Sequence, residues 1–88
     1  MKMAELKYYI TYGNFRPEYQ GQSKFIPAME KWIKKVEEYD CKVKFWGISY
    51  GTSETMVIVI KGTSENFMRI SPPDSPYMNT RTNMIAVF

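Results

Sequence analysis

Apolar and polar side chains alternate near the start of the chain, over residues 6–12. The series that carries this alternation is Leu6, Lys7, Tyr8, Tyr9, Ile10, Thr11 and Tyr12. A period of two is the spacing of a β-strand, because successive side chains of a strand point to opposite faces. The pattern predicts a strand that stops at Gly13-Asn14. Residues 15–24 follow with Arg16-Pro17 and Gly21, which predict a long loop.

Residues 25–39 change to the spacing of a helix. Lysines and glutamates fill one face, and apolar residues recur at intervals of three and four at Phe25, Ile26, Met29, Trp32, Ile33, Val36 and Tyr39. This spacing predicts an amphipathic helix that ends near Asp40. Pro27 is expected in the first turn, where the missing amide donor is tolerated.

The second half of the chain alternates between short elements and turn-forming sequence. β-Branched and aromatic residues predict strands over residues 42–50 and 55–61, which pair antiparallel through a hairpin loop at residues 51–54. Residues 63–70 predict a short helix with a hydroxyl cap at Thr63 and Glu65 in its first turn. Residues 71–76 contain three prolines and predict a loop, after which residues 84–88 predict a last strand.

The order of these elements predicts the fold class. A β-α-β-β-α-β order is typical of an α+β, ferredoxin-like sandwich, with a four-stranded antiparallel sheet and two helices on one face. The chain has 88 residues, which suits one domain, so we expect a single ferredoxin-like domain over residues 1–88.

The strand over residues 56–60 is apolar at every position, as Met56-Val57-Ile58-Val59-Ile60. Two helices on one face of a sheet leave the other face open, and an open face normally carries polar residues. An apolar second face needs another cover, so we expect a homodimer in which two sheets pack against each other.

Composition excludes several chemistries. The chain has no histidine and one cysteine, Cys41, so it cannot build a Ser-His-Asp triad, a histidine metal site, a thiolate cage or an internal disulfide. We therefore expect no metal and no cofactor. Glu37, Glu38 and Asp40 belong to the solvated face of the predicted helix and not to a carboxylate pair for catalysis.

The same features bear on the compartment. A single cysteine is typical of reducing compartments, the longest apolar run is far shorter than the ~20 residues of a membrane span, and the first residues do not start a secretory signal. We expect a cytoplasmic protein without a membrane association. The net charge of +3 is distributed along the chain and forms no basic run.

Two stretches of sequence, together with the order of elements, resemble one group of ferredoxin-like proteins. They are Lys7-Tyr8-Tyr9-Ile10-Thr11-Tyr12, and Lys44-Phe45-Trp46-Gly47-Ile48-Ser49-Tyr50 leading through a turn into residues 56–60. The group is that of the dimeric α/β-barrel proteins, which includes small monooxygenases and muconolactone-isomerase-like enzymes, and the hairpin is similar to that of a small uncharacterised family within it. The resemblance implies a homodimer. Members that act on haem or quinone use a His, or a Trp with Asn, in a cavity between the sheets, and this chain has Trp46, Asn79 and Asn83 but no His.

Polar-tipped and aromatic residues on the predicted strands and loops are the candidates for binding a ligand. They are Tyr9, Thr11, Arg16, Trp46, Tyr50 and Arg81. Arg81 lies in the polar stretch 79–83, which is expected to form a loop before the last strand, and it has the side chain for a two-pronged clamp on a carboxylate or phosphate. The tyrosines suit either a cavity between subunits or a subunit interface.

Three functional hypotheses follow. The first is a small-molecule-binding or structural domain without a catalytic site, since no catalytic constellation is present. The second is a cofactor-independent monooxygenase- or isomerase-like enzyme of the α/β-barrel type. The third is a nucleic-acid-binding domain, which the mildly basic charge favours, but residues 54–61 lack the aromatics that an RNA-recognition sheet stacks on bases.

Overall fold

The computed structural model describes residues 6–50, 53–70 and 75–85. These residues form the elements β1 (Lys7–Phe15), η1 (Pro17–Tyr19), α1 (Gln22–Glu37), β2 (Lys42–Ile48), β3 (Met56–Gly62), α2 (Ser64–Met68) and β4 (Tyr77–Ile85). The α+β class is therefore confirmed. The expected loop at residues 71–76 and the end of the expected last strand fall largely outside the described residues.

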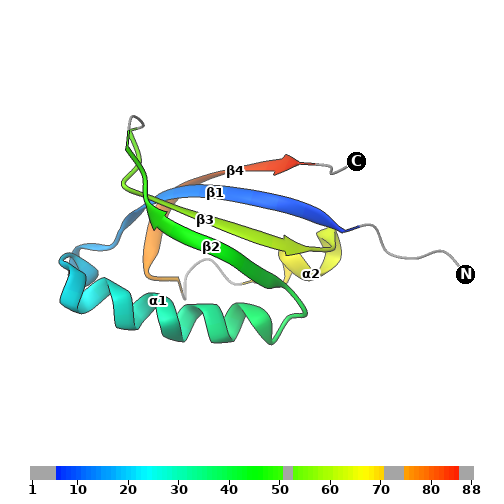
Figure 1. Cartoon of the computed structure of the whole chain (residues 1–88), viewed down its shortest axis with the longest axis horizontal. Helices are drawn as coiled ribbons and strands as arrows, with labels where there is room; N and C mark the ends of the chain where they lie inside the picture. Colours follow the sequence, from blue (N-terminus) through cyan, green and yellow to red (C-terminus); the bar gives the residue numbers. More distant parts are fainter. Residues whose placement is uncertain (1–5, 51–52, 71–74, 86–88) are drawn as a thin grey trace, which may run out of the picture.

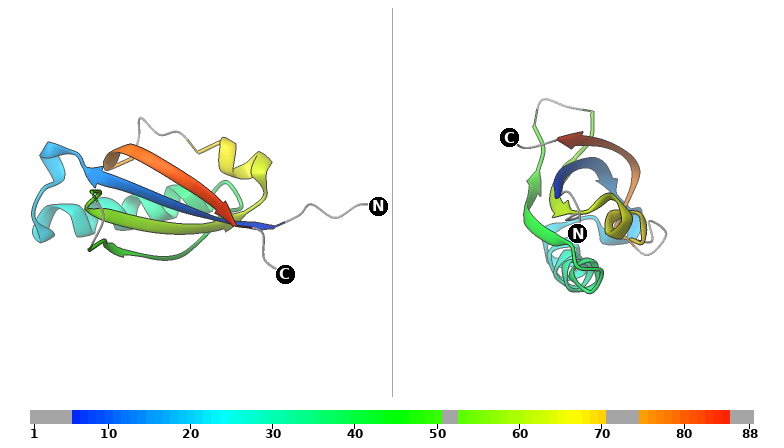
Figure 2. Two further views of the ribbon diagram at one scale, coloured as in Figure 1. Left: turned by 90° about the horizontal axis from the view of Figure 1, so that it is seen from above. Right: turned by 90° about the vertical axis from the view of Figure 1, so that its right-hand side faces the viewer.

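Within the described part of the chain, the strands form one antiparallel sheet in the order β2-β3-β1-β4. The expected antiparallel pairing of β2 with β3 is confirmed. Seen along its strands the sheet is strongly curled, and α1 and α2 lie on its concave side (Figures 1 and 2).

The helix α1 supplies one half of the core. Its residues Phe25, Met29, Trp32 and Val36, spaced by three and four, are buried as the periodicity predicts. They pack against β1 and β3 residues that point to the concave side of the sheet, namely Phe15, Met56, Ile58 and Ile60. Phe15 and Phe25 stack with their ring centroids 4.3 Å apart. Burial of this apolar surface is the main force that holds the helix on the sheet.

The start of α1 differs from the prediction. The helix begins at Gln22, because Gly21 adopts a φ of 98° and its carbonyl accepts from the amides of Lys24 and Phe25. Pro27 consequently lies inside the helix and not in its first turn. The prediction for Pro27 was wrong because it placed no helix upstream of Phe25.

The strand β1 buries the side of the strand that carries Tyr9 and Thr11. Tyr9, Thr11, Gly13 and Phe15 are the buried positions, on the helix side, whereas Tyr8 and Ile10 are only half-buried on the opposite side. The Tyr9 ring stacks on Phe67 of α2 with the ring centroids 4.0 Å apart, so a ring with a polar tip is packed on the helix side.

The strand β4 begins at Tyr77, well before the predicted start at residue 84. Residues 79–83 were expected to form a loop, and this was wrong. Within residues 6–50, 53–70 and 75–85, β4 is an edge strand that pairs with β1 alone, and its side chains from Thr80 to Ile85 are exposed, so an apolar pattern was not needed to form it.

A bulge in β2 places its two aromatic side chains, Phe45 and Trp46, on opposite sides of the sheet. The register with β3 shifts between Val43 and Phe45, so Val43 and Trp46, three residues apart, both pack against the core. Phe45 points to the convex side and is 61% exposed.

The glycine at the end of β3 gives a first testable prediction. A Cβ on Gly62 would lie 2.8 Å from the sulfur of buried Cys41, whereas a Cβ on Gly47 would meet nothing within 4 Å. We expect Gly62→Ala to lower the free energy of unfolding by about 1–3 kcal/mol and Gly47→Ala to change it by about 0.5 kcal/mol or less. Urea denaturation measures both. Equal midpoints for the two variants would contradict this packing, as would a failure of Cys41→Ala to restore the Gly62→Ala variant.

Candidate functional site

A pocket of about 730 Å³ opens on the concave side of the sheet, between α1, α2 and β4. The strands contribute Thr11, Ile60, Tyr77, Met78, Thr80 and Thr82, and the remaining lining residues are Arg16, Trp32, Phe67, Met68, Ile70 and Ser75. Its size falls in the range of pockets that bind small molecules, and most of its lining is apolar or aromatic.

The short second helix is the reason that the pocket exists. α1 has 16 residues, but α2 has only five and is preceded by Thr63, whose hydroxyl accepts from the Asn66 amide as the expected cap. Tyr9 fixes α2 to the sheet, since its hydroxyl donates to Ser64 Oγ at 2.8 Å and its ring stacks on Phe67. Among the residues that the structure describes, a helix of this length leaves part of the concave side beside β4 uncovered.

Tyr77 and Trp32 form one end of the pocket. The Trp32 indole N–H donates to the Tyr77 hydroxyl at 3.0 Å, and the two rings meet edge to face. Tyr77 pairs with Phe15 of β1 and is 6% exposed. Burial raises the pKa of Tyr77 to about 12, only partly opposed by the hydrogen bond from Trp32, so the phenol stays protonated at neutral pH.

Arg16 and Ser75 lie at the same end. The Arg16 Nε donates to the Ser75 carbonyl at 2.7 Å and its backbone amide donates to the Pro76 carbonyl at 2.9 Å. Ser75 Oγ in turn donates to the Tyr77 carbonyl at 2.7 Å. These bonds tie the chain after β1 to the chain before β4, and they hold the guanidinium at the rim of the pocket.

Thr11 and Thr82 form the wall between β1 and β4. The two residues face each other in the register of the strands, and their hydroxyl oxygens are 2.8 Å apart, a hydrogen bond in which either is the donor. Thr11 is buried and Thr82 is exposed, so this pair runs from the floor of the pocket to its mouth.

Of the candidate residues from the sequence, the pocket brings together Thr11 and Arg16, and Tyr9 lies directly behind its Phe67 wall. Tyr9 and Thr11, for which the sequence suggested a cavity between subunits or a subunit interface, are both buried on the helix side of the sheet. Trp46 is not in the pocket, since its ring packs edge-on against Phe15 and Phe25 in the core.

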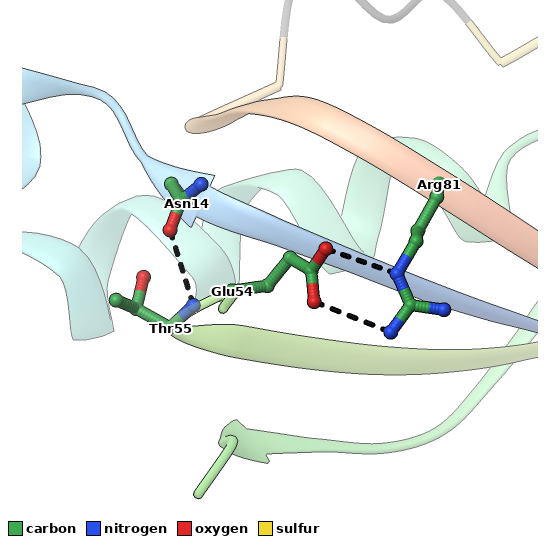
Figure 3. Close-up of polar contacts among 4 residues, drawn as sticks. All are labelled: Asn14, Glu54, Thr55 and Arg81. Atoms are coloured by element: carbon green, nitrogen blue, oxygen red, sulfur yellow. Dashed lines mark hydrogen bonds and ion pairs between the residues drawn. The ribbon is translucent and has the colours of Figure 1, made fainter. Parts of the chain in front are cut away.

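Tyr50 and Arg81 lie away from the pocket. Tyr50 follows β2 and is 88% exposed. Arg81 points to the convex side, where it reaches across β1 to bind Glu54 with two hydrogen bonds of 2.9 and 3.3 Å (Figure 3). Its guanidinium also lies over the ring of Tyr12, 4.4 Å from the centroid. The carboxylate clamp expected of Arg81 thus holds a carboxylate of the same chain.

The ion pair between Arg81 and Glu54 shifts the pKa of both residues. The hydrogen bond from Arg81 lowers the pKa of Glu54, and the bond to Glu54 raises the pKa of Arg81. Next to it, the Asn14 side-chain oxygen accepts from the Thr55 amide at 3.1 Å, which fixes the end of β1 to the start of β3 (Figure 3). These contacts order the convex side and leave no role for Arg81 in the pocket.

The sequence did not point to Phe67, Tyr77, Met78, Thr80 and Thr82 as lining residues. Thr80 and Thr82 alternate with Arg81, which is a strand signal, but the predicted loop at residues 79–83 concealed it. The alternation would have placed both threonines on one face once the strand was extended to Tyr77.

The described lining of the pocket contains few groups that could transfer a proton or hold a metal. The described residues contain no group of three potential metal ligands. The described lining of the pocket includes no carboxylate, lysine or cysteine, and its tyrosine hydroxyl, with a pKa of about 12, is a poor general acid or base at neutral pH.

No helix among the described residues is long and apolar enough to cross a membrane. Comparison of the chain with protein-family models, with curated proteins and with solved structures found no match.

Proposed function

We propose that this protein is a small-molecule-binding domain of the ferredoxin-like, dimeric α/β-barrel type, and that the pocket beside β4 is its binding site. The observation that carries the proposal is the pocket of about 730 Å³, which combines an apolar body with a few polar groups at defined positions. The strand order β2-β3-β1-β4, with both helices on one side, supports the assignment to this fold group.

An enzyme of the monooxygenase or isomerase type is the weaker proposal. Such an enzyme needs a group that moves a proton or holds charge next to the substrate, and the described lining offers only the neutral Tyr77 phenol and the Arg16 guanidinium. We therefore propose a binding protein without a catalytic centre or resident cofactor. The single, buried cysteine supports a reducing compartment, and we propose the cytoplasm.

A substitution that fills the pocket tests whether the pocket is the binding site. Thr82 and Asn83 are neighbours on β4, but Thr82 lines the pocket and Asn83 belongs to the opposite side of the strand. We expect the neutral fluorescent probe N-phenyl-1-naphthylamine to bind the native protein, and Thr82→Trp to weaken this binding about tenfold or more. Asn83→Trp is the matched control and should leave binding unchanged. Equal loss in both variants, or no binding by the native chain, would overturn the proposal.

The convex side of the sheet favours a second proposal, that two copies of the chain associate there. Phe45 of β2 is 61% exposed and Ile85 of β4 is 43% exposed, at the two edges of a face whose centre holds Val59, Val57 and Ile10. Exposed apolar residues that flank an apolar centre are typical of a subunit interface.

Two cations of this face lie over aromatic rings, Lys61 over Tyr8 and Arg81 over Tyr12. A nucleic acid would need rings free to stack on bases and cations free to bind phosphates. We therefore propose a homodimer through this face, and we do not propose nucleic-acid binding.

A further inference from the structure

The pocket beside β4 has a hydroxyl proton to donate. The Tyr77 oxygen accepts from Trp32 Nε1 at 3.0 Å, and among the residues described by the structure no acceptor takes the proton of the phenol itself. The side chain is 6% exposed, so bulk water has little access to it. A buried donor without an acceptor costs free energy, and a ligand oxygen in the pocket would remove that cost.

A second donor group lines the same pocket as Tyr77. Arg16, which lines the same end of the pocket, carries a guanidinium, and this group only donates. Because burial raises the pKa of Tyr77 to about 12, the phenol keeps its proton throughout the physiological range. This end of the pocket therefore suits an oxygen that accepts hydrogen bonds.

The rest of the pocket suits an apolar body. Ile60 forms part of the floor, and Phe67, Met68 and Ile70 form the side next to α2. The hydroxyls of Thr11 and Thr82 in this region form a hydrogen bond with each other. A ligand that fills this part gains from burial of apolar surface.

We infer that the pocket binds a small, uncharged, largely apolar molecule through its carbonyl oxygen, which accepts a hydrogen bond from the Tyr77 hydroxyl. This inference rests on the proposed function. A neutral carbonyl is favoured over a carboxylate because most of the lining residues around the Tyr77 hydroxyl are apolar or aromatic. An anion would lose more hydration on entering the apolar pocket than a ketone loses.

Three probes with one ring system test the inference: naphthalene, 2-acetylnaphthalene and 2-naphthoate. Their affinities are measured by competition with N-phenyl-1-naphthylamine at neutral pH. For the native protein we expect 2-acetylnaphthalene to bind about fivefold to tenfold more tightly than naphthalene, which is the contribution of one hydrogen bond from the Tyr77 hydroxyl to the ligand carbonyl. We expect 2-naphthoate to bind more weakly than the ketone.

The variant that removes the donor is Tyr77→Phe. It should bind naphthalene as the native protein does and lose the preference for the ketone. Because Tyr77→Phe leaves the Trp32 N–H without its acceptor, the double variant Trp32→Phe/Tyr77→Phe serves where the single one is unstable, with the same expected loss of preference. Tyr19→Phe, which removes a hydroxyl outside this pocket, is the control and should keep the preference.

The outcomes separate the two proposals. Equal binding of naphthalene and 2-acetylnaphthalene by the native chain would overturn the carbonyl inference and leave the binding pocket in place. Tighter binding of 2-naphthoate than of the ketone would overturn the preference for an uncharged ligand. Binding of none of the three probes would overturn the proposed function itself. A ketone preference that persists in Tyr77→Phe and in the double variant would overturn the role of the Tyr77 hydroxyl.

Discussion

Replacing Phe45 by glutamate is expected to convert the proposed dimer, with twice the 10.4 kDa mass of the chain, to a monomer. Phe45 is paired with Val59 on β3 and points away from the helices. In a dimer that packs two convex faces together, a carboxylate at this position would be buried among apolar side chains without a partner. The cost of several kcal/mol raises the dissociation constant about a hundredfold or more.

Light scattering across a dilution series measures this change. The matched control is Tyr50→Glu, which puts the same charge on an aromatic position that is 88% exposed and outside the strands. The control should remain a dimer. A native chain that is monomeric at every concentration, or a Phe45→Glu variant that stays dimeric, would contradict association through the convex side.

Raising the pH above about 10 is expected to destabilise the fold through Tyr77. Its folded-state pKa, about 12, exceeds the ordinary value near 10, because burial disfavours the phenolate. In the unfolded chain the phenol loses its proton first, so the stabilising contribution is complete below pH 10 and declines as the pH rises to about 12. The shift corresponds to about 2–3 kcal/mol, out of about 4–13 kcal/mol for a domain of this size.

Urea denaturation at pH 9 and at pH 12 measures the decline, and two variants assign it. Tyr77→Phe is expected to lose less stability between these pH values than the native chain, although it starts lower because Trp32 loses its acceptor. Tyr50→Phe, on an exposed ring, should keep the native decline. The Cys41 thiol, whose pKa burial and Asp40 raise, acts in the same direction in all three proteins. An equal decline in Tyr77→Phe would contradict the buried phenol.

The part of the fold that was predicted from the sequence is the part that periodicity controls. The helix α1 buries a stripe of residues at intervals of three and four, and this stripe is visible in the chain before any packing is known. The hairpin of β2 and β3 has apolar strands on both sides of a turn sequence, and its pairing was predicted for the same reason.

Elements that depend on tertiary contacts were not predicted. β4 is polar from Asn79 to Asn83 and becomes a strand because β1 offers it a free edge, which no local pattern records. The buried face of β1 was missed because Tyr9 and Thr11 hide their polar atoms in bonds to Ser64 and Thr82, far away in the sequence.

The pocket was beyond sequence reasoning for a related physical reason. It arises from the curl of the sheet and from the five-residue length of α2, and its residues come from four separate parts of the chain (Figure 2). Two candidate residues, Thr11 and Arg16, were chosen for their side-chain chemistry and do line it. Trp46, Tyr50 and Arg81 were chosen on the same grounds, and the packing places them elsewhere.

The location of a bound ligand tests the central claim most directly. Methyl-labelled protein with 2-acetylnaphthalene should give nuclear Overhauser contacts from the ligand ring to the methyl groups of Thr82, Met68 and Met78, all of which line the pocket beside β4. Contacts to the methyl groups of Val57 and Ile10 instead would place the ligand on the convex side of the sheet and contradict the account.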